Sequence, residues 1–205
     1  TNIFNAIETI PKDELQKTVI LFSAHSIPVK IMDKGDQYPA EISSTVKSTM
    51  KSLYSLQKEK LSQIDDKIVE LPHILCWQSK VGYLPWLGPS TSNTFVDLSS
   101  KGFTNAIIVP IAFTSDHIET LFEIDHEYRE LAEKNGVKLI RAPSLNDSEL
   151  LTKAQTEIVL EHLQSNKIIN SPQYRVHCTN CVRPNECRAV LGYTKDELFA
   201  NQRQD

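Results

Sequence analysis

The sequence has no excess of basic residues, no long hydrophobic segment and few cysteines, and each absence argues against a class of protein. Its 22 Lys and Arg are outnumbered by 26 Asp and Glu, which gives a net charge of -4. A nucleic-acid surface needs clustered basic residues, so no nucleic-acid partner is expected. No apolar run approaches the roughly 20 residues that span a bilayer. The 205 residues suffice for one globular domain with a sizeable core.

Internal repeats, low-complexity tracts and the glycine spacing of nucleotide-binding loops are also missing. Of the four cysteines, Cys178, Cys181 and Cys187 lie together near the C-terminus. A secreted disulfide scaffold would spread its cysteines through a shorter chain. The C-x2-C-x5-C spacing favours a metal instead, either zinc or an iron–sulfur cluster, and free cysteines stay an open alternative. His177 is a candidate fourth ligand for zinc, whereas Cys76 falls in a predicted strand and is expected in the core.

What the sequence does contain is an alternation of strand and helix patterns. Apolar runs predict strands over residues 18–24, 72–77, 105–112 and 137–141. Apolar residues at helical spacing predict helices over residues 1–12, 38–60, 91–100, 115–135 and 148–163. Strands that alternate with helices imply right-handed crossovers and a parallel sheet. We therefore predict an α/β fold in which helices flank a four-stranded parallel sheet.

The C-terminal tail differs in character from the rest of the chain. Residues 164–184 are polar and irregular and include the cysteine group, and residues 194–197 form a capping box for a last short helix. We therefore divide the chain into an α/β domain over residues 1–165 and an irregular, cysteine-bearing extension over residues 166–205.

Polar side chains gather where three of the predicted strands end. They are Ser23, His25 and Ser26 after the first strand, Trp77, Gln78, Ser79 and Lys80 after the second, and Thr114, Ser115, Asp116, His117 and Glu119 after the third. In an open parallel sheet, ligands bind outside the carboxyl ends of the strands, so these side chains are expected to converge. A lone histidine is more often a packed or surface residue. At a strand end, however, His25 is placed to accept a proton or bind a metal together with Glu119.

The predicted helix over residues 115–135 carries a line of acids. At about 100° per residue, one stripe holds Asp116, Glu119, Glu123, Glu127 and Glu130. For Glu127 and Glu130, a solvated helix face is the simpler interpretation. The first three acids begin at the strand end, where they either complement the helix dipole or guide divalent cations or protons.

Three aromatic residues, Trp77, Trp86 and Phe113, lie near the same strand ends. Large aromatics usually fill cores, but beside a polar cluster they also suit a flat, apolar ligand. The loop over residues 81–89 is rich in Gly and Pro and lacks phosphate-loop spacing.

Taken together, these stretches resemble the ferrochelatase family, whose members insert ferrous iron into protoporphyrin IX to make protohaem. The matching segments are LFSAHSIP at residues 21–28, GDQYPAE at 35–41, WQSKVG at 77–82, PWLGP at 85–89 and PIAFTSDHIETL at 110–121. Shorter matches follow at residues 144–146 and 162–166. The resemblance covers nearly the whole chain, its motifs are long and specific, and it implies a Rossmann-like, chelatase-type fold.

The resemblance implies catalytic roles for His25 and Glu119, with Asp116, His117 and Glu123 on an acidic path beside them. Metallation of a porphyrin removes two pyrrole N–H protons and delivers a dehydrated metal ion to a planar ring. On this basis His25 takes a proton or receives the metal, and the acids pass protons or iron along the helix. The residues do not decide between these two assignments.

The resemblance also implies a substrate site. Trp77 and Phe113 are expected to line the porphyrin pocket, with Ser79 and Lys80 as further substrate-binding residues. Aromatic walls of this kind can hold the macrocycle puckered, which is strain derived from binding.

For the tail, the resemblance implies a [2Fe–2S] cluster, because animal and fungal members hold one with three C-terminal cysteines that resemble Cys178, Cys181 and Cys187. The gap between the last two is one residue longer here than in the family. The same kinship implies Fe2+ and protoporphyrin IX as substrates, a homodimer, and a location on the matrix side of the mitochondrial inner membrane.

The resemblance is to the second half of the family only. The N-terminal chelatase half, which would supply part of the pocket, the membrane-facing surface and the fourth cluster cysteine, is absent from this chain. Two smaller departures are a longer connection over residues 55–71 and Tyr83 in a place where the family usually has Pro. The alternatives are a non-catalytic module that binds a tetrapyrrole or metal, a zinc-stabilised structural domain, and a chelatase for cobalt or nickel.

Overall fold

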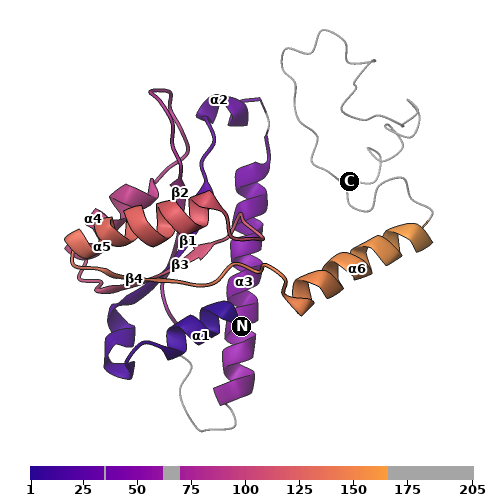
Figure 1. Cartoon of the computed structure of the whole chain (residues 1–205), viewed down its shortest axis with the longest axis horizontal. Coiled ribbons are helices and arrows are strands. Elements are labelled where there is room, and N and C mark those ends of the chain that lie inside the picture. Colours follow the sequence, from indigo (N-terminus) through magenta and orange to yellow (C-terminus); the bar gives the residue numbers. More distant parts are fainter. Residues whose placement is uncertain (35, 62–69, 166–205) are drawn as a thin grey trace.

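Four parallel strands in the order β2-β1-β3-β4 form the centre of the molecule (Figure 1). The structure, a computed structural model, describes residues 1–34, 36–61 and 70–165. The strands are β1 (Thr18–His25), β2 (His73–Gln78), β3 (Asn105–Pro110) and β4 (Lys138–Arg141). All four coincide with the predicted apolar runs apart from a residue or two at their ends. The predicted α/β fold with a four-stranded parallel sheet is confirmed, in a strand order typical of doubly wound folds.

β1 lies between β2 and β3 and is buried on both faces. Leu21 is paired with Ile74 of β2 and Ile108 of β3. Because successive side chains of a strand point to opposite faces, Ile20 and Phe22 belong to one core, and neighbouring positions such as Leu21 belong to the other. This explains why the strand sequences are continuously apolar instead of alternating with polar residues.

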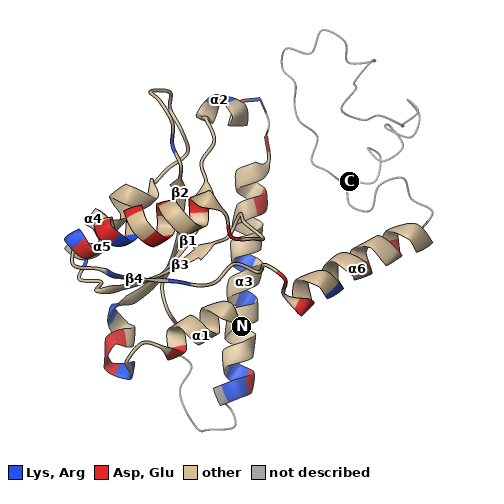
Figure 2. Ribbon diagram, viewed as in Figure 1, with Lys and Arg blue, Asp and Glu red and all other residues tan. Residues whose placement is uncertain are grey.

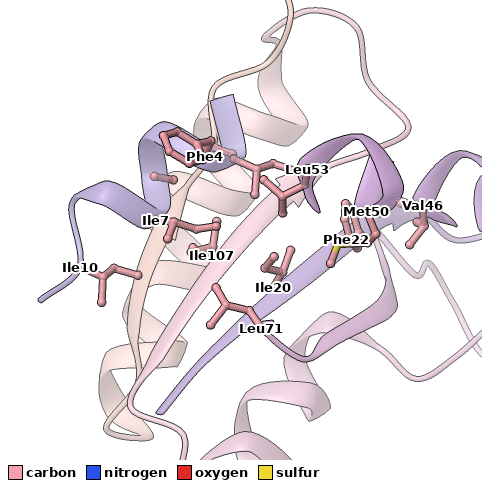
Figure 3. Close-up of a cluster of buried hydrophobic side chains, with 14 of the residues drawn as sticks. Phe4, Ile7, Ile10, Ile20, Phe22, Val46, Met50, Leu53, Leu71 and Ile107 are labelled. Carbon is pink, nitrogen blue, oxygen red and sulfur yellow. The ribbon is translucent and has the colours of Figure 1, made fainter. Parts of the chain in front are cut away.

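On one face, α1 (Asn2–Glu8) and α3 (Tyr38–Leu61) cover the sheet. Figure 3 shows Phe4 and Ile7 of α1 and Leu53 of α3 lying over the strand residues Ile20 and Ile107. Between the two helices the chain passes through the short helices η1 (Lys12–Lys17), a 3-10 helix, and α2 (Val29–Met32). The packing of α3 brings its first residue to the carboxyl end of β1, which becomes important at the site.

On the opposite face lie α4 (Thr91–Ser100), the π-helix η2 (Glu119–Tyr128) and α5 (Arg129–Lys134). Phe95, Leu98 and Ile124 pack here against Leu21 and Cys76, all fully buried. Cys76 is therefore the core residue that the sequence predicts, and burial raises the pKa of its thiol to about 11. Acidic side chains follow one another along η2 and α5 (Figure 2).

The prediction of one regular helix over residues 115–135 is wrong. Helical structure begins at Ile118, because hydrogen bonds to Asn146 and Thr120 hold residues 115–117 in a loop. The next ten residues form the π-helix η2, in which residues five apart become neighbours instead of residues four apart. The predicted acidic stripe at 100° per residue therefore does not form, and Asp116 is not on the helix at all.

The helices at the two ends of the described chain differ in how they pack. The predicted helix over residues 1–12 is shorter, since α1 ends before Pro11, and its apolar residues are buried. By contrast α6 (Glu149–Gln164) extends away from the sheet in Figure 1 and has no buried residue. Its Leu150 and Leu163 are each 71% exposed. Across the described ranges, no helix is long and apolar enough to cross a membrane.

The predicted extension over residues 166–205, with its capping box at 194–197 and its cysteine group, lies outside the described residues.

Candidate functional site

The carboxyl ends of β1, β2 and β3 meet at one edge of the sheet, as the strand-end argument predicts. His25 is paired with Gln78 of β2, and Ser23 with Pro110 of β3. The helix η2 reaches the same edge, because the Gln78 side-chain amide donates to the carbonyl oxygen of Glu119 at 3.4 Å. Residues from three strand ends and one helix therefore contribute to a single site.

His25 is half-buried at the end of β1, with its ring held by the chain itself. Its Nδ1 lies 2.6 Å from the carbonyl oxygen of Ser26. A carbonyl oxygen can only accept, so Nδ1 carries a proton, and in the neutral ring Nε2 is left as the proton acceptor. The local fold thus fixes the tautomer in which His25 can act as a base.

His25 is one acceptor, and His117 and Glu119, at the start of η2, form a second group of acceptors. His117 Nδ1 lies 3.1 Å from the carbonyl oxygen of Ser115, which again leaves Nε2 as the acceptor of the neutral ring. Nε2 is 3.7 Å from Glu119 Oε2, and the side chains are 37% and 33% exposed. Glu119 Oε2 is shielded from solvent and accepts no hydrogen bond from any residue that the structure describes. Two acceptors that face each other in this way favour the capture of a proton or a cation.

Tyr38, the first residue of α3, contacts the backbone of His25, and it was not selected from the sequence. Its hydroxyl donates to the carbonyl oxygen of His25 at 3.0 Å. Burial, and after it the charge of Glu119, raises the pKa of Tyr38, so the phenol keeps its proton. Gln78, the strand partner of His25, contacts the Glu119 carbonyl oxygen, so His25 and Glu119 lie at the same edge of the sheet. In the sequence, the only signal for Tyr38 is its position in the GDQYPAE segment over residues 35–41.

Glu123 has the opposite environment from Glu119, one helical turn away. Its carboxylate accepts hydrogen bonds from the Ser79 amide at 2.9 Å, from Gln78 Nε2 at 3.0 Å, from the Tyr128 hydroxyl at 2.6 Å and from the Ser79 hydroxyl. The π-helical spacing brings Tyr128, five residues on, beside Glu123. Burial and the hydrogen bond to Glu123 raise the pKa of Tyr128, which stays a donor. Glu123 therefore joins η2 to the end of β2.

Asp116 is also fully engaged in hydrogen bonds. Its Oδ1 lies 2.8 Å from Arg141 Nη1, and its Oδ2 accepts from Asn146 Nδ2 at 3.0 Å. The hydrogen bond from Asn146, with a smaller contribution from Arg141, lowers the pKa of Asp116 below its usual range. Asp116 was expected at this edge of the sheet from its place after the third strand. Arg141, the last residue of β4, was not selected from the sequence.

The predicted substrate-binding residues lie at the site edge with different exposures. Trp77 is only 5% exposed and packs against Tyr38, with ring centroids 5.9 Å apart. Phe113 is half-buried, and its ring centroid is 4.6 Å from that of His117. Ser79 has a positive φ of 61° and is hydrogen-bonded to Glu123, whereas Lys80 is exposed.

Among the residues that the structure describes, no group of three His, Cys, Asp or Glu side chains could hold a metal ion. His117 and Glu119 form a pair, and the two other acids are already engaged by hydrogen-bond donors. The proposed metal ligands Cys178, Cys181 and Cys187 lie outside the described residues, so their arrangement stays a prediction.

Comparison with known proteins gives a clear family relationship. The family model described as Ferrochelatase matches residues 1–163. The mitochondrial ferrochelatase of Dictyostelium discoideum is 49% identical over 166 residues, which are 80% of this chain and 37% of that protein. The human mitochondrial ferrochelatase is 43% identical over 194 residues, 94% of this chain and 42% of the relative. The chicken enzyme (Gallus gallus) is 43% identical over 98% of this chain and 45% of the relative. The chain thus spans less than half the length of these relatives.

Among solved structures, a cobalamin (vitamin B12) biosynthesis CbiX protein from Marinobacter aquaeolei aligns with a TM-score of 0.42 and 15% identity. The alignment covers 73% of this chain and 99% of that protein.

Proposed function

Since this chain belongs to the ferrochelatase family, we propose that it is the C-terminal half of an enzyme that inserts Fe2+ into protoporphyrin IX to form protohaem. The observation that carries the proposal is the Glu119 carboxylate oxygen Oε2, which is shielded from water and lies 3.7 Å from His117 Nε2. Within the described part of the chain, this oxygen has no hydrogen-bond donor. A buried acceptor without a donor needs an explanation. Proton or metal transfer at this position supplies one.

The reaction removes two pyrrole N–H protons, and the site offers two groups of acceptors. His25 Nε2, freed by the hydrogen bond of Nδ1 to Ser26, accepts the first proton. The pair of His117 and Glu119 accepts the second, and the half-buried Glu119 carboxylate attracts the incoming divalent iron. Tyr38 holds the backbone of His25 by its hydroxyl. Both acceptors therefore need no rearrangement of the chain to act.

Asp116 and Glu123 act in this proposal by holding the site in place. Each carboxylate already accepts hydrogen bonds from several donors, so neither is free to bind a metal ion without losing them. We propose that Phe113, packed on the His117 ring, forms the wall on which the macrocycle rests. Trp77 supports Tyr38 from the core, and the exposed Lys80 meets the carboxylate groups of the porphyrin.

The wider assembly is also part of the proposal. Residues 1–165 are the C-terminal chelatase domain and residues 166–205 its extension. The apolar side of α6, with Leu150 and Leu163 exposed, is the surface that the N-terminal half of the enzyme covers. That half completes the pocket and contacts the membrane. The names of the relatives support a mitochondrial location, which we place at the matrix side of the inner membrane, with the enzyme as a homodimer.

In the extension, Cys178, Cys181 and Cys187 are proposed as three ligands of a [2Fe–2S] cluster, with a fourth cysteine from outside this chain. Thiolates are the ligands that such clusters require, and the cluster serves here as a resident group separate from the substrate iron. Metal and sulfide analysis of protein purified without oxygen tests this assignment. Iron and sulfide in equal amounts are expected, and zinc without sulfide would contradict it.

The proposed reaction is tested with the complete natural protein that carries this chain. Protoporphyrin IX and Fe2+, or Zn2+ in its place, are added without oxygen, and the metalloporphyrin is followed by its absorption and fluorescence. Steady formation of metalloporphyrin is expected. A shifted porphyrin spectrum without metal insertion would instead identify a tetrapyrrole-binding module. No interaction with porphyrin, combined with bound zinc, would identify a structural domain.

A further inference from the structure

One arginine joins two acids of the site region, and nothing in the proposed chemistry uses it. Arg141, the last residue of β4, places Nη1 2.8 Å from Asp116 Oδ1 and Nε 2.8 Å from Asp125 Oδ1. Its side chain is only 16% exposed. Because the guanidinium is planar and its donors have fixed directions, one side chain determines where both carboxylates lie. Asp116 precedes η2 and Asp125 is within it, so β4 holds both the segment before this helix and the helix itself.

Asn146 holds the same segment from the loop that follows β4. Its Oδ1 accepts from the backbone amide of Asp116 at 2.8 Å, and its Nδ2 donates to Asp116 Oδ2 at 3.0 Å. The backbone amide of Asn146 donates to the carbonyl oxygen of Thr114 at 2.7 Å. The residue has a positive φ of 49°, which asparagine tolerates better than most residues. Thr114 and Asp116 are thus both fixed to one residue.

The segment fixed in this way leads directly to the proposed catalytic pair. His117 follows Asp116, and its backbone amide donates to the Thr120 hydroxyl at 2.9 Å. That hydroxyl lies 3.2 Å from Asp116 Oδ1. We propose that Arg141 and Asn146 are positioning residues, which hold the Asp116 segment so that His117 and Glu119 face the site. The catalytic consequence of this inference rests on the proposed function. The contacts that hold the segment do not depend on that function.

The catalytic test compares four variants of the complete natural protein. Asn146→Gly removes the side-chain amide and keeps a residue that adopts positive φ, and Arg141→Gln removes both ion pairs. Arg141→Lys keeps the positive charge but lacks the planar guanidinium with its fixed donor directions. The matched control is Arg129→Gln, since Arg129 is 48% exposed and contacts the same Asp125 at 3.7 Å with no link to Asp116.

We expect Asn146→Gly and Arg141→Gln to lower kcat for metal insertion about 10- to 100-fold, because small misplacements of catalytic groups are costly. KM for the porphyrin is expected to stay within about twofold, since neither residue touches the substrate in this account. Arg141→Lys is expected to keep more activity than Arg141→Gln, and Arg129→Gln to match the parent protein. If Arg141→Gln does not fold, Asn146→Gly and Arg141→Lys carry the test.

Hydrogen–deuterium exchange of the same proteins reports on the segment without any catalysis. Peptides that cover residues 113–119 are expected to exchange faster in the Asn146 variant, because the Asp116 amide loses its acceptor, Asn146 Oδ1. Faster exchange is also expected in Arg141→Gln, because the Asp116 carboxylate loses its ion pair with β4. Peptides that contain Ser79, whose amide is bound to Glu123, serve as the internal control and are expected not to change.

The outcomes separate the two proposals. Unchanged exchange over residues 113–119 would overturn the inference, as would a rise in KM with constant kcat. Faster exchange with kcat within twofold of the parent would also overturn it, since the segment would then be held for no catalytic reason. If the parent protein inserts no metal at all, the proposed function fails, and faster local exchange still upholds Arg141 and Asn146 as the residues that hold the segment.

Discussion

Glu119 and Glu123 lie one turn apart on the same π-helix, yet their carboxylates have opposite surroundings. Glu123 accepts hydrogen bonds from Ser79, Gln78 and Tyr128, so both of its oxygens are satisfied. Glu119 Oε2 is hidden from solvent and faces a second acceptor, His117 Nε2, at 3.7 Å. The difference shows that residue type does not decide the role of an acid. The hydrogen-bond donors that the fold places around each carboxylate decide its role.

The same contrast sets Asp116 apart from Glu119. Arg141 and Asn146 occupy both oxygens of Asp116, so this carboxylate stabilises a loop. Substitutions that leave the shape of a side chain nearly unchanged test whether this contrast holds.

The largest effect is expected for Glu119→Gln. Loss of a group that transfers protons in the transition state typically costs about 10²- to 10⁴-fold in rate, and we expect a loss of metal insertion in this range. The free energy of unfolding is expected to change by less than about 0.5 kcal/mol, because Glu119 Oε2 has no donor to lose among residues 1–34, 36–61 and 70–165. Steady-state rates and urea unfolding of the complete protein measure both quantities.

The control for that substitution is Glu130→Gln, which removes an exposed acid of the same helical segment. Glu130 is 71% exposed and pairs with Lys134 at 3.6 Å, so neither rate nor stability should change. Near-normal metal insertion by the Glu119→Gln protein would refute the catalytic role of Glu119.

Glu123→Gln should show the reverse pattern, with stability affected first. The new amide nitrogen cannot accept, so at least one of its donors, such as the Tyr128 hydroxyl, loses its acceptor. Hydrogen bonds to a charged group contribute about 1.5–3 kcal/mol each, and we expect a loss of about 2–3 kcal/mol of unfolding free energy. Urea denaturation measures it. A stable protein with abolished activity would instead place Glu123 among the groups that transfer protons or iron.

The smallest effect is expected for Asp116→Asn, and it should depend on pH. The folded state lowers the pKa of Asp116, so its carboxylate contributes stability above the ordinary value of about 3.9. That contribution is lost as the pH falls through the lower folded-state value. The Asn variant is therefore less stable than the parent at pH 7, and the gap closes as the pH falls below about 4. Unfolding free energies measured from pH 7 to pH 3 check this. An equal gap at every pH would contradict it.

The sequence predicts the sheet and the converging strand ends for a clear physical reason. Strands buried on both faces must be continuously apolar, and parallel strands bring their carboxyl ends to one edge, so His25, Gln78 and Glu119 meet there. Such long-range contacts can be predicted without knowing how individual side chains pack.

The π-helix and the side-chain contacts around it could not be predicted in this way. Local sequence suggested a regular helix from residue 115, whereas the observed form depends on partners far away in the sequence. Glu123 is held by Ser79 of another strand end, and Asp116 by Asn146, 30 residues further on. Tyr38 reaches His25 only because of where α3 packs on the sheet. Periodicity within one segment contains no information about such partners.

The central claim is that His25, at the end of β1, and Glu119, at the start of η2, act on the same bound porphyrin. A double-mutant cycle on metal insertion tests it most directly, with His25→Ala, Glu119→Gln and the double variant in the complete natural protein. Groups that act as one unit have strongly non-additive effects, so we predict that each single variant is slower by orders of magnitude and that the double variant is scarcely slower than the slower single one. Independent effects whose free energies add would contradict the account.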